Sequence, residues 1–115
     1  MVPSDEICYD MTDAILVLCT CPDEASADLI CEQLLTRHLA ACINQLPGLT
    51  SVYRWQGNIE RTREIQLIIK SRAALFEPLS QCILDHHPYE VPEILALPTS
   101  HGHQPYLDWL TQETS

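Results

Sequence analysis

The chain has 115 residues, 46% of them hydrophobic, and its six basic residues against sixteen acidic ones leave a formal net charge of -10. This length suits one globular domain, and so acidic a chain has no basic stripe with which to displace counterions from nucleic acid. No apolar run reaches membrane-spanning length, and the start MVPSDEICYDMTD lacks the features of a signal peptide. We therefore expect a cytoplasmic protein that binds neither nucleic acid nor membranes.

Six cysteines occur without a C-x-x-C pair, so the usual zinc-finger and thioredoxin spacings are absent. In a reducing compartment such cysteines are mostly free thiols that fill the core. We expect this of Cys31, Cys42 and Cys82.

The first half of the chain predicts a loose arm over residues 1–12, followed by a folded domain over residues 13–115. AILVLCT, residues 14–20, is a short apolar run typical of a central buried strand. Pro22 can open a helix that ends near Leu39, with an apolar stripe at helical spacing. Residues 41–56 predict a long strand with a bulge or bend at Pro47-Gly48.

Gly57-Asn58 predicts the tight turn of a hairpin, which continues as the strand NIERTREIQLIIK. Leu75, Leu79, Cys82 and Ile83 mark a second helix, which begins just before Pro78 or bends there and ends before Pro88. EILAL predicts a fourth strand, and Pro105 can open a last helix.

This order of elements predicts an α+β fold, the ferredoxin-like βαββαβ sandwich with an added C-terminal helix. Both main helices would cover one face of a four-stranded antiparallel sheet. The other face would expose apolar side chains, which indicates an oligomer.

The topology also predicts a site. The first and last strands should be antiparallel neighbours, so the end of the first strand meets the beginning of the last at one edge. Cys19, His86, His87 and Glu93 should converge there, beside the tip of the hairpin. A thiolate, an imidazole and a carboxylate could hold Cu(II) or Zn(II).

Simpler interpretations stand beside this one. His86 could cap the helix end and His87 could bond a backbone group. Cys19 and Cys21 share a face of an extended strand and could bind Cu(I), but Cys21 also stands at a helix entrance where its thiol pKa could be partly lowered. His101-Gly102-His103 could bind a metal between subunits, but a solvated turn is favoured. Tyr53 and Trp55 could stack on a ligand or contact a neighbouring subunit.

Enzyme motifs are missing from the sequence. It contains no G-x-S-x-G, P-loop or H-E-x-x-H segment, and its three glycines form no phosphate-binding loop. Glu93 and Tyr89 could serve as acid or base, but nothing supplies an oxyanion hole or an activated nucleophile. We expect a protein without catalytic activity.

Several stretches together resemble the CutA family, the divalent-cation tolerance proteins. They are TCPDEASADLICEQLLTRHLAACIN, PGLTSVYRWQGNI, the E-x-x-L-x-x-K pattern of Glu64 to Lys70, HHPYEVPEI and YLDWL, and they span almost all of residues 14–110. The resemblance implies a tight homotrimer like that of the PII signalling proteins and a role in metal tolerance. It also implies Cu(II) binding through Cys19, His86 and Glu93.

The rival hypothesis is a PII-like signalling module. A small ligand or a partner protein would then occupy a cleft between subunits, with Trp55, His87 and Tyr89 as the candidate cleft residues.

Overall fold

The computed structural model describes residues 12–115, and the predicted arm, apart from Thr12, lies outside the described residues. The predicted βαββαβ order is confirmed, with a last helix appended. The elements in chain order are β1 (Ala14–Cys21), α2 (Glu24–Thr36), β2 (Cys42–Trp55), β3 (Asn58–Arg72), the short 3-10 helix η1 (Ala73–Leu75), α3 (Phe76–His86), β4 (Leu95–Pro98) and α4 (Gln104–Glu113).

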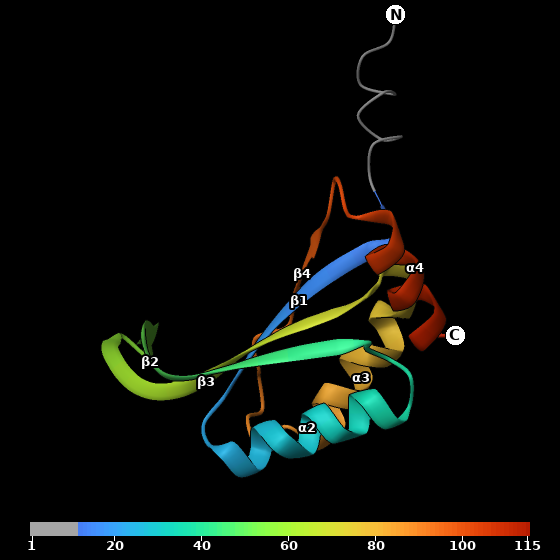
Figure 1. Cartoon of the computed structure of the whole chain (residues 1–115). Coiled ribbons are helices and arrows are strands. Elements are labelled where there is room, and N and C mark those ends of the chain that lie inside the picture. The colour runs from blue at the N-terminus through green and yellow to red at the C-terminus, as the bar shows by residue number, and fades with distance from the viewer. Residues whose placement is uncertain (1–11) are drawn as a thin grey trace, which may run out of the picture.

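The four strands form one antiparallel sheet in the order β2-β3-β1-β4. β1 pairs with β3 from Ala14 opposite Arg72 to Cys21 opposite Ile65, and with β4 from Ile15 opposite Pro98 to Leu18 opposite Leu95. The first and last strands are therefore neighbours, as predicted. Figure 1 shows α2 and α3 on one side of the sheet, with the far part of the β2–β3 hairpin projecting beyond the body.

The hydrophobic core lies between the sheet and helices α2 and α3. Alternate residues of β1 point into it because successive side chains of a strand face opposite ways. The buried cluster also takes Leu67 and Ile69 from β3, and it contains Ile15, Val17, Cys19, Cys21, Ala27, Ile30, Leu34, Leu79, Cys82 and Ile83. The opposite face of the sheet is open, and Leu95 and Leu97 of β4 are exposed there.

Helix α2 is shorter at both ends than the sequence predicted. Its N-cap is Asp23, whose side chain accepts a 2.8 Å hydrogen bond from the Ser26 amide, so the helix begins at Glu24 rather than at Pro22. It ends at Thr36, because His38 takes a left-handed conformation with φ of 58° and turns the chain away.

The hairpin keeps the predicted irregularity but shifts the predicted turn. The register of β2 against β3 jumps between Leu46 and Leu49, which confirms a bulge at Pro47-Gly48. The turn residues are Gln56 and Gly57, not Gly57 and Asn58, and both have positive φ. A tight hairpin turn with two positive φ angles matches strand twist and accepts glycine at its second position.

The last elements agree with the sequence except at their boundaries. Pro78 lies in the first turn of α3, where a missing amide hydrogen does not break the helix. β4 covers Leu95–Pro98 instead of the predicted EILAL segment. α4 carries its predicted proline in the first turn. Within residues 12–115, no helix has the length and apolar character needed to span a membrane.

Candidate metal and ligand site

The end of β1 places two thiols on the core side of the sheet. Cys19 and Cys21 are fully buried, while Thr20 between them points to the open side. Cys19 lies opposite Leu67 and Cys21 opposite Ile65 on β3. The alternation of a strand therefore brings the two sulfur atoms to one face, as the C-x-C spacing predicted.

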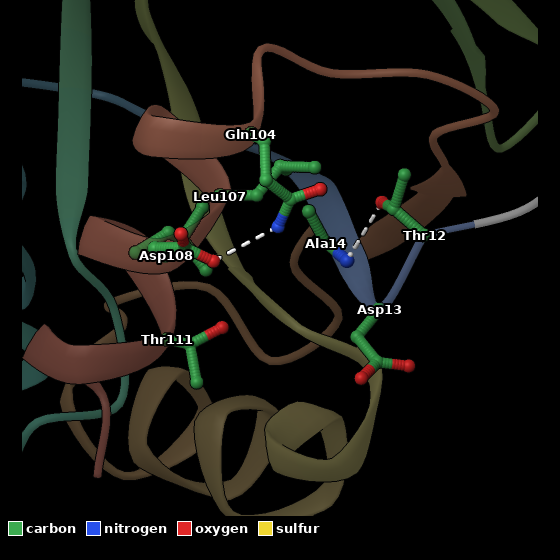
Figure 2. Close-up of a pocket in the computed structure, with 8 residues that line it drawn as sticks. Thr12, Asp13, Ala14, Gln104, Leu107, Asp108 and Thr111 are labelled. Atoms are coloured by element: carbon green, nitrogen blue, oxygen red, sulfur yellow. Dashed lines mark hydrogen bonds between the residues drawn. The ribbon is translucent and has the colours of Figure 1, made fainter.

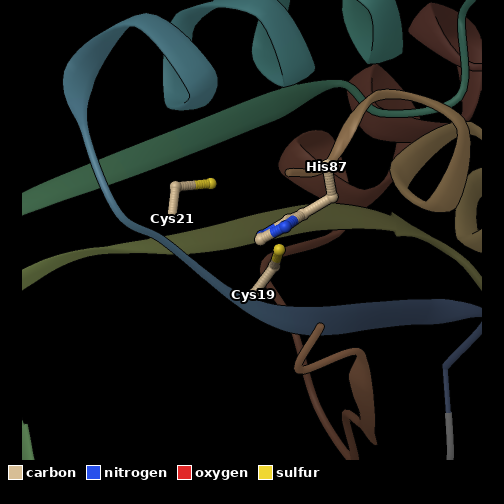
Figure 3. Close-up of side chains that lie close together, drawn as sticks. All are labelled: Cys19, Cys21 and His87. Atoms are coloured by element: carbon tan, nitrogen blue, oxygen red, sulfur yellow. The ribbon is translucent and has the colours of Figure 1, made fainter. Parts of the chain in front are cut away.

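His87 completes a compact cluster with these thiols. One ligand atom from each of Cys19, Cys21 and His87 lies within 4.8 Å of the others, and all three residues are buried. Figure 3 shows the imidazole reaching from the segment after α3 toward the two cysteines. Within the described part of the chain, this is the one such group of three Cys, His, Asp or Glu side chains.

Both ring nitrogens of His87 already have hydrogen-bond partners. Nε2 lies 2.7 Å from the carbonyl oxygen of Thr20, and Nδ1 accepts a 3.0 Å hydrogen bond from the amide of Tyr89. A carbonyl can only accept, so these contacts specify a neutral ring with its proton on Nε2. His87 therefore has no free lone pair for a metal in this arrangement, and its bond to a backbone group agrees with the simpler interpretation of this residue.

His86 has the opposite character. It ends α3, and its Nδ1 lies 2.8 Å from the carbonyl oxygen of Cys82 one turn earlier. That contact leaves Nε2 available as a ligand atom. His86 is not a member of the compact cluster. Neither histidine therefore meets both requirements of a metal ligand. His87 lies beside the thiols but has no free nitrogen, and His86 has a free nitrogen but lies outside the cluster.

The two thiols influence each other's acidity. The hydrogen bond to Cys21 and burial together raise the pKa of the Cys19 thiol, and the charge of nearby Glu93 raises it further. The same hydrogen bond lowers the pKa of Cys21, against the effect of burial. A metal ion binds the deprotonated thiolate, and the lowered pKa of Cys21 favours that form for one of the two thiols.

On the open side of the same edge lies a cleft of about 800 Å³. Trp55 reaches it from the hairpin, and Tyr89 and Glu93 reach it from the segment between α3 and β4. This confirms that the hairpin and that segment share an edge. The other lining residues are Thr20, Ser51, Val52, Tyr53, Glu64, Gln66, Pro88, Glu90 and Val91.

Glu64 lines this cleft too, although the sequence placed it only in the E-x-x-L-x-x-K pattern and not among the candidate site residues. It is only 7% exposed, and its Oε2 accepts a 2.7 Å hydrogen bond from the Tyr89 hydroxyl. Burial and then this carboxylate raise the pKa of Tyr89. The sequence offered one sign that Glu64 is unusual, which is a charged residue in the middle of a strand. Its contact with Tyr89 becomes visible only in the folded structure.

The sheet separates the predicted ligands into two groups. Cys19 belongs to the core side, whereas Glu93 lines the cleft on the open side. His87 and Tyr89 connect the two, since their rings are 4.8 Å apart. The end of β1 and the segment between α3 and β4 do meet at one edge, as predicted. The set of Cys19, His86 and Glu93 does not form a group as compact as the cluster with His87.

A smaller hollow of about 340 Å³ lies between the start of β1 and α4. Beside it Gln104 donates a 2.8 Å hydrogen bond to Asp108, and the Ala14 amide donates to the Thr12 hydroxyl (Figure 2). These polar groups already satisfy one another. His101 and His103 lie in an exposed segment just before α4.

The fold and site together define an α+β, ferredoxin-like protein with a thiol–imidazole cluster at one sheet edge. The family model of the CutA1 divalent ion tolerance protein matches residues 15–113. The divalent-cation tolerance protein CutA of Citrobacter koseri is 46% identical over 98 residues, which is 85% of each chain. The chain belongs to the CutA1 divalent ion tolerance family.

Solved structures agree with this assignment. CutA from Xylella fastidiosa superimposes with a TM-score of 0.88 at 44% identity, covering 90% of this chain and all of the other. The Thermus thermophilus divalent cation tolerance protein reaches 0.87 at 44% identity, covering 89% of this chain and 99% of the other. The rice CutA1 structure reaches 0.87 at 36% identity, covering 92% and 97%.

Proposed function

We propose that this protein binds a divalent metal ion, with Cu(II) as the best fit, and contributes to divalent-cation tolerance without catalysing a reaction. The observation that carries the proposal is the pair of buried thiols of Cys19 and Cys21 at the end of β1, beside the segment that carries His86 and His87. Sulfur and imidazole ligands favour copper and zinc over magnesium or calcium, and copper stands highest in the divalent affinity series. The family's name for tolerance of divalent ions supports the same class of ligand.

For the ligand atoms we propose the Cys19 thiolate, the His86 imidazole and the Glu93 carboxylate. Cys19 faces the core and Glu93 lines the cleft on the open side, so in this proposal the two side chains must move toward each other to bind one ion. His86 offers a free Nε2, whereas His87 would have to give up its bond to the Tyr89 amide before it could ligate. In this proposal the hydrogen bonds of His87 position the segment after α3, and His86 reaches the ion only when that segment moves.

Calorimetric titration of the reduced protein with Cu(II), beside Zn(II), tests the assignment. The double variant Cys19→Ala, His86→Ala should lose tight Cu(II) binding. Cys42→Ala is the matched control, because this half-buried cysteine lies at the start of β2, outside the cluster. Undiminished affinity in the double variant would refute the assignment.

We further propose a homotrimer in the reducing cytoplasm. The open face of the sheet exposes Leu95 and Leu97, and the projecting hairpin exposes Val52, Trp55 and Ile59. So much apolar surface is typical of an interface. Light scattering should give about three times the chain mass of 13.0 kDa, and a monomer would contradict the architecture.

The cleft favours a second candidate function, a PII-like signalling module that binds a small ligand or a partner protein. Its volume lies in the range of small-molecule sites. Trp55 and Tyr89 line it, and His87 contacts the Tyr89 ring from the core side. Metal-dependent change in the shape or partners of the oligomer would support signalling, whereas an unchanged oligomer would favour simple metal binding.

A further inference from the structure

The C-x-C pair at the end of β1 places two thiols where one ion can bridge them. Cys19 and Cys21 are both 0% exposed, and their sulfur atoms lie within 4.8 Å of each other (Figure 3). A metal–thiolate bond is about 2.3 Å long in zinc sites, so an ion held by two thiolates at a trigonal or linear angle separates its sulfur atoms by about 4.0–4.6 Å. The sulfur separation in the folded chain is compatible with this spacing.

The surroundings of the two thiols offer an ion few further ligands. His87 is the third residue of the compact group, but its Nε2 donates to the carbonyl oxygen of Thr20 and its Nδ1 accepts from the Tyr89 amide. Among the described residues, no carboxylate belongs to the group. The group therefore presents two sulfur atoms, and neither a free imidazole nitrogen nor a carboxylate oxygen accompanies them.

This small number of ligands selects among metal ions. Zn(II) takes four ligands in structural sites, and Cu(II) prefers a square arrangement with nitrogen and oxygen atoms. Cu(I) is a soft ion that prefers thiolates, and its filled d shell imposes no geometry, so two sulfur ligands suffice. Both cysteines belong to the hydrophobic core cluster, and an apolar shell limits the access of the water that would complete the coordination of a divalent ion.

We propose that Cys19 and Cys21 bind one Cu(I) ion per chain as a two-coordinate dithiolate site. The ion replaces both thiol protons, which pass to solvent. His87 lies beside the pair without ligating, and it holds the segment after α3 against the end of β1. The inference rests on the proposed binding of copper at this edge, but it takes Cys21 as the second ligand, where Cu(II) would use His86 and Glu93. Both oxidation states need Cys19, so they compete for this edge.

Anaerobic competition against a chromophoric Cu(I) chelator, with ascorbate to keep the copper reduced, measures binding to the full chain. We expect one tightly bound ion per chain, and an X-ray absorption spectrum with two sulfur neighbours and no nitrogen or oxygen at bonding distance. Excess Zn(II) should not displace the ion. A coordination shell with nitrogen or oxygen neighbours would overturn the dithiolate site, and displacement by an equimolar amount of Zn(II) would overturn the choice of Cu(I).

Cys21→Ser separates this site from the Cu(II) assignment. Loss of the second sulfur should weaken Cu(I) binding at least about 100-fold, because even groups outside the coordination shell contribute about 10–100-fold to metal affinity. Cu(II) binding, followed by electron paramagnetic resonance, should be unchanged in this variant. His86→Ala should show the reverse, with Cu(II) binding lost and Cu(I) binding kept.

Cys42→Ser is the matched control, because Cys42 is a half-buried cysteine at the start of β2, outside the group. It should leave the affinity for both oxidation states unchanged. Undiminished Cu(I) affinity in Cys21→Ser would overturn the inference. If Cys21→Ser does not fold, the count of sulfur neighbours in the absorption spectrum of the parent chain tests the site by itself.

The inference and the proposed function fail in different ways. Loss of Cu(I) binding in His86→Ala, with Cys21→Ser unaffected, would refute the dithiolate site and keep the copper ligands proposed above. Tight Cu(I) binding without Cu(II) binding would keep the dithiolate site and refute those ligands. Failure of the parent chain to bind either oxidation state would refute copper binding altogether.

Discussion

The imidazole of His87 lies with Nε2 2.7 Å from the carbonyl oxygen of Thr20, and this contact ties the segment after α3 to the end of β1. The contact spans 67 residues of sequence. It places the imidazole beside two buried thiols, and Tyr89, two residues later, lines the cleft. Both candidate sites therefore depend on the placement of this one segment.

We expect His87→Ala to lower the free energy of unfolding by about 2–4 kcal/mol, because it removes two buried hydrogen bonds and leaves a cavity. His86→Ala should cost less than about 1 kcal/mol, since this half-buried residue bonds only within the last turn of its own helix. Denaturant unfolding at one fixed protein concentration measures both variants. Equal costs would show that the Thr20 contact does not hold the segment.

Tyr89→Phe should lower the free energy of unfolding by about 1–3 kcal/mol at neutral pH, because the buried Glu64 carboxylate loses its donor. Tyr53→Phe is the control. Its hydroxyl bonds Thr62 on the exposed hairpin at 2.9 Å, so its loss should cost less. Denaturant unfolding of the two variants gives the comparison, and a larger loss in Tyr53→Phe would contradict it.

The same tyrosine predicts a dependence on alkaline pH. Burial raises the pKa of Tyr89 above its value in the unfolded chain. The folded protein therefore keeps a proton that the unfolded chain releases, and the stability contributed by Tyr89 is present below about pH 10 and declines as pH rises further. Unfolding curves at stepped alkaline pH should fall less steeply for Tyr89→Phe than for the parent. Parallel curves would refute this role.

Thiol labelling should separate the cysteines by location. Cys19 is fully buried and has a raised pKa, and Cys21 is fully buried too, whereas Cys42 is half-buried. We expect alkylation of the native reduced protein to reach Cys42 at least about ten-fold faster than either residue of the C-x-C pair. Peptide mapping by mass spectrometry after timed quenching gives the rates. Comparable rates would indicate that the end of β1 opens in the native state, which is also how a metal would enter.

A charge on the open sheet face should disrupt the proposed oligomer. Leu97 of β4 is 44% exposed on that face, and Leu97→Glu should reduce the mass measured by light scattering toward one chain. Leu84→Glu is a matched control, because Leu84 is 47% exposed on α3 in the helix layer. Dissociation by Leu84→Glu alone would place the interface on the helices instead.

Local patterns in the sequence determined most of the fold. The apolar run of β1, the turn and bulge of the hairpin, and the alternation of helices with strands sufficed for the βαββαβ order and for the neighbouring placement of β1 and β4. The two-residue period of a strand also placed Cys19 and Cys21 on one face. These features follow from interactions between residues close in sequence, or from the few ways in which such elements connect.

The tertiary structure alone decided which side chains meet. The choice between His86 and His87 depends on where α3 stops, because the last helical residue and the first extended one point in different directions. The burial of Glu64 also depends on the tertiary structure, because its hydrogen-bond donor Tyr89 is 25 residues away in the sequence. Cys19 and Glu93 approach one edge but lie on opposite sides of the sheet, because Cys19 faces the core from β1 and Glu93 lines the open-side cleft from the segment before β4. No pattern in the sequence shows on which side such a crossing segment will lie.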